Sequence, residues 1–176
     1  MKPTLYIFSG LPGTGKTTIS KKFAAFYGMP YFRIDTIEQG LREVCSIKVE
    51  GEGYRLAYRI VKDNLAIGSD VVVDCCNPID LTRKEWHEAA IKENSKYTDI
   101  EIVCSDKSIH KNRVQNRKND IHGLELPTWE QIEKREYHDW KSDRIQIDTS
   151  NKNEEESFEE LISKLKLQKK NTGRKR

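Results

Sequence analysis

Short apolar runs and amphipathic stretches alternate along the whole chain. The apolar runs are rich in β-branched and aromatic side chains, which is typical of buried strands. Between them, apolar residues recur at helical spacing, most clearly where Tyr54, Tyr58, Val61 and Leu65 share one face. The strand-like runs cover residues 4–8, 31–34, 71–73, 100–104 and 145–147. Strands that alternate with helices predict an α/β fold, with a five-stranded parallel sheet covered by helices on both faces.

Three polar positions indicate where helices begin. Asp35 stands at an N-cap position directly after the second strand-like run. Thr82-x-x-Glu85 and Thr128-x-x-Gln131 have the spacing of capping boxes, in which two side chains satisfy backbone N–H groups reciprocally. These positions predict helices from about residues 36, 83 and 129.

The turn after the first run carries the most specific motif of the chain. Its sequence, Gly10-Leu11-Pro12-Gly13-Thr14-Gly15-Lys16-Thr17, fits the P-loop pattern G-x-x-x-x-G-K-[ST] between a strand and a helix. Glycines there let backbone N–H groups converge on a phosphate at the helix N-terminus. Lys16 then reaches the β- and γ-phosphates of ATP, and the Thr17 hydroxyl binds Mg²⁺. The residues expected to bind ATP are Gly10, Pro12, Gly13, Thr14, Gly15, Lys16, Thr17 and Thr18.

Two aspartates follow strand-like runs and should face the same crevice as the P-loop, because ligands bind beyond the carboxyl ends of parallel strands. Asp74 ends an apolar run, as in a Walker B strand, and is a candidate to hold Mg²⁺ with Thr17. Asp35 is a candidate to accept the proton of an acceptor hydroxyl. The alternative for Asp35 is a plain helix cap, and for Asp74 a turn-capping aspartate.

A basic helix face precedes a polar segment. His110, Arg113 and Arg117 are spaced three and four residues apart, and the stretch from Lys118 to Leu126 follows directly. This pattern predicts a mobile lid over about residues 113–127, whose arginines would neutralise the charge that develops during phosphoryl transfer. The alternative is an ordinary solvated helix face.

Composition narrows the class of protein. The 176 residues suit one α/β domain over residues 1–168, followed by a basic tail over residues 169–176. The basic tail is the only feature that favours binding to nucleic acid, and we interpret it as a solvated terminus.

No apolar run approaches the ~20 residues that span a bilayer, so we expect a cytoplasmic protein without membrane contact. The four cysteines form no C-x-x-C pair, which favours reduced thiols over zinc. The oligomeric state stays open.

The chain resembles the small P-loop kinases of the adenylate-kinase-like group. It is most similar to bacterial predicted kinases labelled "AAA family ATPase", with polynucleotide 5′-hydroxyl kinases, chloramphenicol phosphotransferase and zeta toxins as further relatives. The resemblance rests on segments 9–18, 33–38, 77–78, 104–106, 113–117, 126–129, 135–137 and 147–149. It implies the three-layer P-loop NTPase sandwich with strand order 2-3-1-4-5, a helical lid, and ATP with Mg²⁺ as phosphate donor. In polynucleotide kinases an aspartate in the place of Asp35 activates the acceptor, and lid arginines in the places of Arg113 and Arg117 contact ATP.

These observations predict an ATP-dependent kinase that transfers the γ-phosphate to a hydroxyl of a small molecule. Lys16, Asp35, Arg113 and Arg117 are its expected catalytic residues. One alternative is a polynucleotide 5′-hydroxyl kinase. The other is an ATP-binding switch, which would need no acceptor base in the place of Asp35. The acceptor itself is not readable from the sequence, because specificity lies in the shape of the pocket.

Overall fold

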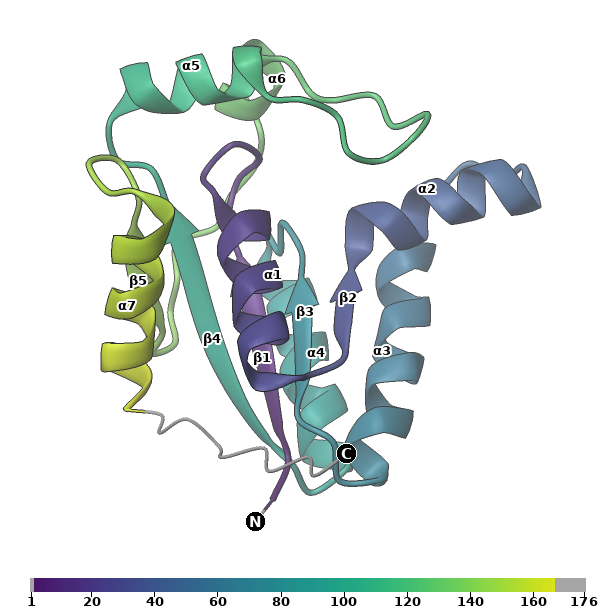
Figure 1. The fold of residues 1–176 in the computed structure, drawn as a ribbon. Coiled ribbons are helices and arrows are strands. Elements are labelled where there is room, and N and C mark those ends of the chain that lie inside the picture. Colours follow the sequence, from purple (N-terminus) through teal and green to yellow (C-terminus); the bar gives the residue numbers. More distant parts are fainter. Residues whose placement is uncertain (1, 167–176) are drawn as a thin grey trace, which may run out of the picture.

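A five-stranded parallel sheet forms the centre of the molecule (Figure 1). The computed structural model describes residues 2–166, so the basic tail and the predicted domain end at residue 168 lie outside the described residues. The strands are β1 (Thr4–Ser9), β2 (Tyr31–Arg33), β3 (Val71–Asp74), β4 (Lys96–Val103) and β5 (Ile145–Asp148). They are arranged in the order β2-β3-β1-β4-β5, and each neighbouring pair is parallel. The fold class and strand order predicted from the sequence are therefore confirmed.

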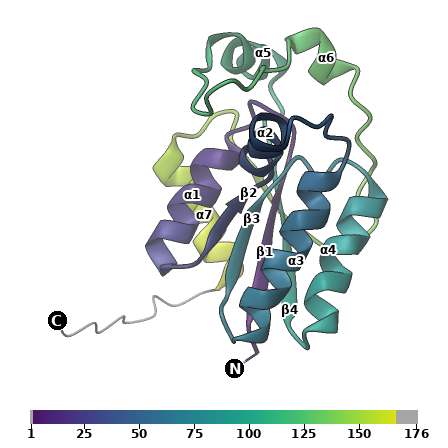
Figure 2. The same ribbon diagram turned by 90° about the vertical axis from the view of Figure 1, so that its right-hand side faces the viewer.

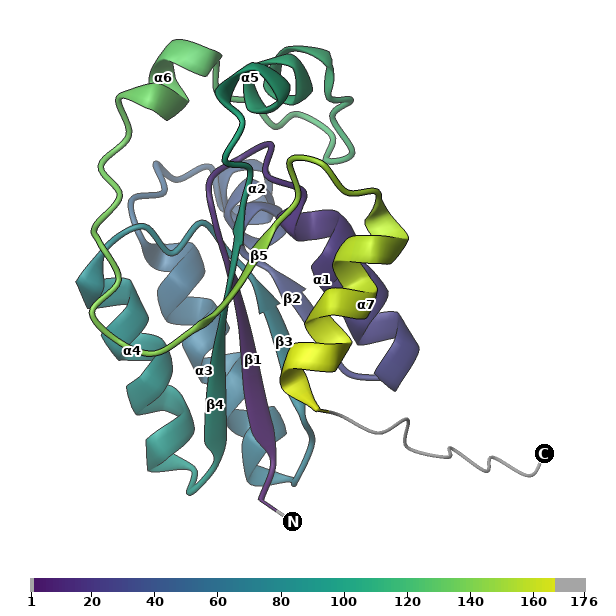
Figure 3. The same cartoon turned by 90° about the vertical axis from the view of Figure 1, so that its left-hand side faces the viewer.

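Helices cover both faces of this sheet, as Figures 2 and 3 show from opposite sides. The helices are α1 (Lys16–Tyr27), α2 (Ile34–Cys45), α3 (Glu52–Ala66), α4 (Asp80–Lys92), α5 (Lys107–Asn116), α6 (Trp129–Glu133) and α7 (Glu154–Leu165). α1 and α7 pack on one face, and α3 and α4 on the other, with α2 against α3. α5 and α6 lie beyond the carboxyl ends of the strands, above the loop that joins β1 to α1 (Figure 1).

Alternating side chains of the strands build two hydrophobic cores. In β1, Leu5 and Ile7 face α3 and α4, whereas Tyr6 and Phe8 face α1 and α7. The first core is completed by Trp86 of α4, which is fully buried. Burial on both faces explains why the strands read as continuous apolar runs in the sequence.

Helix starts follow the sequence signals only in part. The Thr128 hydroxyl accepts from the backbone N–H of Gln131, and the Gln131 side chain accepts from the backbone N–H of Thr128, so this capping box is confirmed. The N-cap prediction for Asp35 is wrong: α2 starts at the buried Ile34, with Arg33 as its cap, and Asp35 lies within the first turn. The predicted box at Thr82 is also wrong, because α4 already begins at Asp80 and the Thr82 hydroxyl donates to the Ile79 carbonyl.

Membrane insertion finds no support in the helices. None of those within residues 2–166 combines the length and the apolar character that a bilayer-spanning segment requires.

Candidate functional site

The P-loop joins β1 to α1 as the sequence predicts, and two of its glycines are sterically required. Gly10 and Gly13 have φ values of 149° and 87°. A Cβ on Gly10 would lie 2.3 Å from the carbonyl oxygen of Ile102, and one on Gly13 would lie 2.6 Å from a methyl group of Val114. α1 begins at Lys16 directly after Gly15, so the free N–H groups of its first turn belong to the same loop. This arrangement fits an anion such as a phosphate.

Lys16 is held by a buried ion pair. Its ammonium donates to Oδ1 of Asp74, and Oδ2 of Asp74 accepts from the Tyr31 hydroxyl at 2.6 Å. The Lys16 side chain is 9% exposed and that of Asp74 is fully buried. Burial favours the neutral form of Lys16, yet the nearby carboxylates, Asp74 foremost, raise its pKa overall. The pair is therefore charged, and it fixes the lysine at the mouth of the P-loop.

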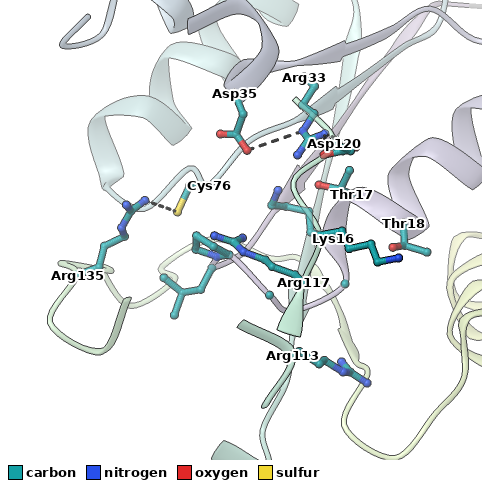
Figure 4. Close-up of a pocket in the computed structure, with 16 residues that line it drawn as sticks. Lys16, Thr17, Thr18, Arg33, Asp35, Cys76, Arg113, Arg117, Asp120 and Arg135 are labelled. Atoms are coloured by element: carbon teal, nitrogen blue, oxygen red, sulfur yellow. Dashed lines mark hydrogen bonds and ion pairs between the residues drawn. The ribbon is translucent and has the colours of Figure 1, made fainter. Parts of the chain in front are cut away.

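This pair bears on the predicted magnesium ligands. Both oxygens of Asp74 are engaged by Lys16 and Tyr31, so a direct contact between Asp74 and Mg²⁺ requires Lys16 to leave. The Thr17 side chain also hydrogen-bonds to Asp74 and helps to lower its pKa, and Thr17 lines the cavity beside the P-loop (Figure 4). No group of three or more acidic, histidine or cysteine side chains within residues 2–166 is placed to hold a metal ion. A hydrated Mg²⁺ that also contacts phosphate oxygens needs only one or two protein ligands, and Thr17 fits that role.

Asp35 lies in the same cavity as Lys16. The cavity measures about 410 Å³, and Figure 4 shows Asp35 and Lys16 on its walls. The Asp35 carboxylate is 48% exposed, lies 3.8 Å from Nε of Arg33, and is close enough to raise the pKa of Lys16. It lies in the first turn of α2, at the end of the helix that the macrodipole makes electropositive.

α5 is locked to the P-loop through His110. The buried imidazole of His110 donates from Nε2 to the carbonyl oxygen of Pro12 at 2.8 Å, and the Trp129 ring packs edge-on against it. Arg113, one turn later, donates to the hydroxyl and the carbonyl oxygen of Thr149 at 2.7 and 2.8 Å. Arg113 therefore joins α5 to the loop after β5 instead of pointing freely into solvent.

Arg117 differs from Arg113 in that its guanidinium forms no ion pair with a carboxylate among residues 2–166. It caps the C-terminus of α5 with an extended backbone and lines the cavity beside Lys16. Its Nε and Nη2 are buried without a hydrogen-bond partner among the described residues. Burial lowers its pKa, and Arg33 and Arg135 lower it further, whereas Asp35 alone opposes them. Buried donors without partners are costly, so this guanidinium is suited to an incoming anion.

The segment predicted to form a lid reaches towards α2 (Figure 1), and its residues Lys118 and Asp120 line the cavity. Near its tip, the Asp120 carboxylate accepts from Nη1 of Arg33 and from the ammonium of Lys21, each at 2.8 Å. A Cβ on Gly123 would lie 2.5 Å from the Glu43 carboxylate, which shows how closely the segment approaches α2. The segment is thus already folded over the cavity in this structure.

A second, smaller cavity of about 220 Å³ adjoins the P-loop on the side of β5. It lies among Gly15, Arg113, Thr149 and Asn153. The Thr149 hydroxyl donates to the carbonyl oxygen of Thr14 at 2.7 Å, so the loop after β5 is tied to the P-loop itself.

The structure brings together the four residues predicted to be catalytic, since Lys16, Asp35, Arg113 and Arg117 all line the first cavity. It also adds residues for which the sequence suggested no role: Arg33, Cys76, Asp120, Arg135 and Thr149. Arg33, Arg135 and Thr149 fall within segments that carry the family resemblance, which is the signal that could have found them. Cys76 and Asp120 have no such local signature.

Comparisons with known proteins support the fold. No protein-family model and no curated protein matches this sequence. Among solved structures, a gluconokinase from Sinorhizobium meliloti is similar over 94% of this chain and 92% of its own, with 17% identity and a TM-score of 0.65. A sugar kinase from Janibacter is similar over 94% and 95%, with 15% identity and a TM-score of 0.67.

A third similar structure is the adenylyl sulfate (APS) kinase of Mycobacterium tuberculosis in complex with AMPPNP and APS. The likeness covers 94% of this chain and 98% of that one, with 14% identity and a TM-score of 0.64. At such identities the likeness concerns the fold. The strand order, the P-loop and these neighbours agree that the chain has the fold of the adenylate-kinase-like P-loop kinases.

Proposed function

We propose that this protein is an ATP-dependent phosphotransferase that moves the γ-phosphate of ATP to a hydroxyl of a small molecule. One observation carries the proposal: the Asp35 carboxylate faces the cavity that Lys16 and Arg117 also line. A protein that only binds ATP has no need of an acceptor base opposite its phosphate cradle. A transferase needs a base and a phosphate cradle on the two sides of one space.

The donor nucleotide would occupy both cavities. The P-loop N–H groups and Lys16 would hold its β- and γ-phosphates. Its adenine ring would lie in the smaller cavity, beside Arg113 and Thr149. The APS kinase with AMPPNP bound supports this assignment by its fold. Mg²⁺, held by Thr17 and phosphate oxygens, would supply charge neutralisation when bound. Asp74 would join it only after Lys16 turns to the nucleotide.

The transfer step assigns one role to each side chain. The acceptor oxygen forms a bond to the γ-phosphorus, the bond from that phosphorus to the bridging oxygen of ADP breaks, and Asp35 takes the proton of the hydroxyl. Lys16 and Arg117 stabilise the charge on the transferred group and on the departing ADP. The lid segment, folded over the cavity, would exclude water that competes with the acceptor.

Two other functions use the same fold. A polynucleotide 5′-hydroxyl kinase would also use Asp35 as a base, and its only additional support is the basic tail, which lies outside the described residues. An ATP-binding switch would leave Asp35 without a role. The small-molecule kinase is preferred because the cavity at Asp35 is modest in volume and framed by the lid segment.

The direct test is ATP turnover by the full chain with separate pools of acceptors. ADP release would be followed with Mg²⁺ alone, with a pool of hydroxyl metabolites, and with a 5′-hydroxyl oligonucleotide. We expect the metabolite pool to stimulate ADP release and a phosphorylated product to appear by mass spectrometry. Stimulation by the oligonucleotide alone would identify a polynucleotide kinase, and ATP binding without stimulation by either would favour the switch.

A further inference from the structure

Positive charge exceeds negative charge around the cavity beside the P-loop. The charged side chains that line it are Lys16, Arg33, Arg113, Arg117, Lys118 and Arg135, against Asp35 and Asp120. Asp74 neutralises Lys16 from beneath, and Asp120 neutralises Arg33. Arg117 and Arg135 remain without a carboxylate partner among residues 2–166. A nucleotide bound at the P-loop would employ Arg117, which leaves Arg135 to be explained.

Arg135 approaches the cavity from the wall opposite Thr18. In Figure 4 its guanidinium lies beside Cys76, on the far side of Lys16 and Arg117 from Thr18. Its one hydrogen-bond partner among the described residues is the Cys76 thiol, at 3.6 Å from Nη1. Burial raises the pKa of that thiol, so it stays neutral and offers only a weak acceptor. Arg135 therefore stands at the Asp35 side of the cavity and forms no ion pair with a carboxylate among residues 2–166. The nearest compensation is the longer-range attraction of Glu38, whose pKa Arg135 helps to lower against the larger effect of burial.

The backbone around Arg135 is firmly anchored, although the side chain is exposed. The N–H of Arg135 donates to the carbonyl oxygen of the buried Ile132. Three residues later, the N–H of His138 donates to the carbonyl oxygen of Pro78 at 2.8 Å. The buried guanidinium of Arg83 then donates to the carbonyl oxygens of both Pro78 and His138. These contacts tie the segment after α6 (residues 134–144, here called the strap) to the loop after β3. The backbone position of Arg135 is therefore set before any ligand binds.

Placing cations together without an anion is unfavourable in the free protein. Burial is the main cause of the lowered pKa of Arg117; Asp35 opposes the shift, whereas the repulsion from Arg33 and Arg135 adds to it. A bound anion would relieve this repulsion, and guanidinium groups bind oxyanions well because their N–H donors match phosphate and carboxylate oxygens. The arrangement therefore fits a second anion, next to Asp35 and distinct from the nucleotide.

We propose that Arg135, supported by Arg117 and Arg33, forms an oxyanion subsite for the acceptor, which is a small molecule carrying a phosphate or carboxylate group near its reactive hydroxyl. This inference rests on the proposed function and narrows its substrate class. When the anion binds to Arg135, the hydroxyl of the same molecule is held between Asp35 and the phosphate end of the P-loop. Arg135 thereby determines specificity, and neutral alcohols are poor acceptors.

The test separates the two anion sites by filling the first. Protein saturated with AMPPNP and Mg²⁺ is titrated with inorganic phosphate, and binding is followed by the NMR shifts of the Asp35 and Cys76 amides. We expect saturable shifts in wild type. Arg135→Ala should weaken phosphate binding at least about tenfold, the usual worth of a charge-assisted hydrogen bond. Arg135→Lys should lose less phosphate affinity than Arg135→Ala, because lysine keeps the positive charge. Arg59→Ala, which removes the same charge from a groove between α3 and α4, is the matched control and should bind like wild type.

A second titration with acetate in place of phosphate distinguishes the two kinds of acceptor. Tighter binding of acetate indicates a carboxylated acceptor, and tighter binding of phosphate indicates a phosphorylated one. Turnover gives an independent readout: anionic hydroxyl compounds should stimulate ADP release more than their neutral counterparts, and Arg135→Ala should raise the acceptor KM more than it lowers kcat.

Two results would overturn the inference while leaving the kinase proposal intact. One is normal AMPPNP binding with phosphate binding that is absent or identical in Arg135→Ala. The other is equal stimulation by neutral and anionic acceptors. ADP release stimulated only by a 5′-hydroxyl oligonucleotide would reject the small-molecule assignment. Failure of AMPPNP itself to bind would reject the proposed function and this inference with it.

Discussion

The two halves of the candidate site are built in opposite ways. On the nucleotide side, the P-loop backbone, Lys16 and Arg113 are engaged by protein partners, through the buried Asp74 and through Thr149. On the acceptor side, Arg117 and Arg135 form no ion pair with a carboxylate within the part of the chain that the structure describes, and Asp35 is half exposed. The first half comes from one motif and the backbone that it shapes. The second is assembled from side chains of β2, α2, α5 and the strap after α6.

This difference separates stability from function. Side chains that are paired in the free protein contribute to folding as well as to binding, so their removal should cost both. Side chains left unpaired contribute little to folding, and burying them without partners even opposes it. Their removal should lower activity while the free energy of unfolding hardly changes.

Lys16→Ala should show the largest combined effect. Turnover should fall by at least about 10³-fold, because an electrostatic contact to the transferred phosphate is lost. The free energy of unfolding should fall by roughly 3 kcal/mol, since Asp74 stays buried without its counter-ion. The double variant Lys16→Ala/Asp74→Asn should recover much of the stability and none of the turnover. Urea denaturation and ADP release measure the two effects, and wild-type stability in Lys16→Ala would contradict the role given to the buried pair.

Arg117 and Arg113 offer a matched pair from the two halves. Arg117→Ala should lower kcat by about 10³-fold and change the free energy of unfolding by less than about 0.5 kcal/mol. Arg113→Ala removes two hydrogen bonds to Thr149 and should destabilise the free protein by about 1–2 kcal/mol. Both arginines are half-buried, so neither lies on an ordinary solvated helix face. Equal stability losses in the two variants would erase the distinction between the halves.

The contact between the lid segment and the body of the protein should have a smaller effect. Asp120→Ala removes the ion pairs to Lys21 and Arg33, and exposed pairs of this kind are worth up to about 1 kcal/mol. Without nucleotide, trypsin should therefore cleave after Lys118 up to roughly fivefold faster than in wild type. Glu125→Ala, in the same segment, is the control. An unchanged cleavage rate in Asp120→Ala would mean that these pairs do not hold the segment.

The pH dependence of that contact follows from its pKa. The hydrogen bond from Lys21, with Arg33 beside it, lowers the pKa of Asp120 to about 2, whereas a free aspartate titrates near about 3.9. Because the pKa in the folded state is lowered, the contact is complete above the free value and is lost as the pH falls through about 2. Hydrogen exchange of the segment, corrected for its intrinsic rate, should therefore show the same difference between wild type and Asp120→Ala from pH 8 to pH 5.

The two halves also differ in how far the sequence predicted them. The P-loop is a local motif. Its eight consecutive residues, together with the strand pattern before them and the helix pattern after them, are enough to predict the positions of Gly10 and Lys16. The acceptor side depends on contacts between distant positions: Arg33 meets Asp120 across 87 residues, and Arg135 reaches Cys76 across 59. The strap that carries Arg135 has no hydrophobic period, so no pattern indicated its course. Asp35 was placed in the right cavity, and only its position in the helix was misjudged.

Asp35→Asn tests the kinase proposal most directly, because it changes the acceptor side alone. The variant keeps the size of the side chain and leaves the phosphate cradle untouched, so AMPPNP affinity and the free energy of unfolding should stay close to wild type. Acceptor-dependent phosphoryl transfer should fall by roughly 10²–10⁴-fold, the usual worth of a positioned general base. An Asp35→Asn protein that phosphorylates its acceptor at the wild-type rate would contradict the role of Asp35 as the acceptor base and remove the observation that carries the proposal.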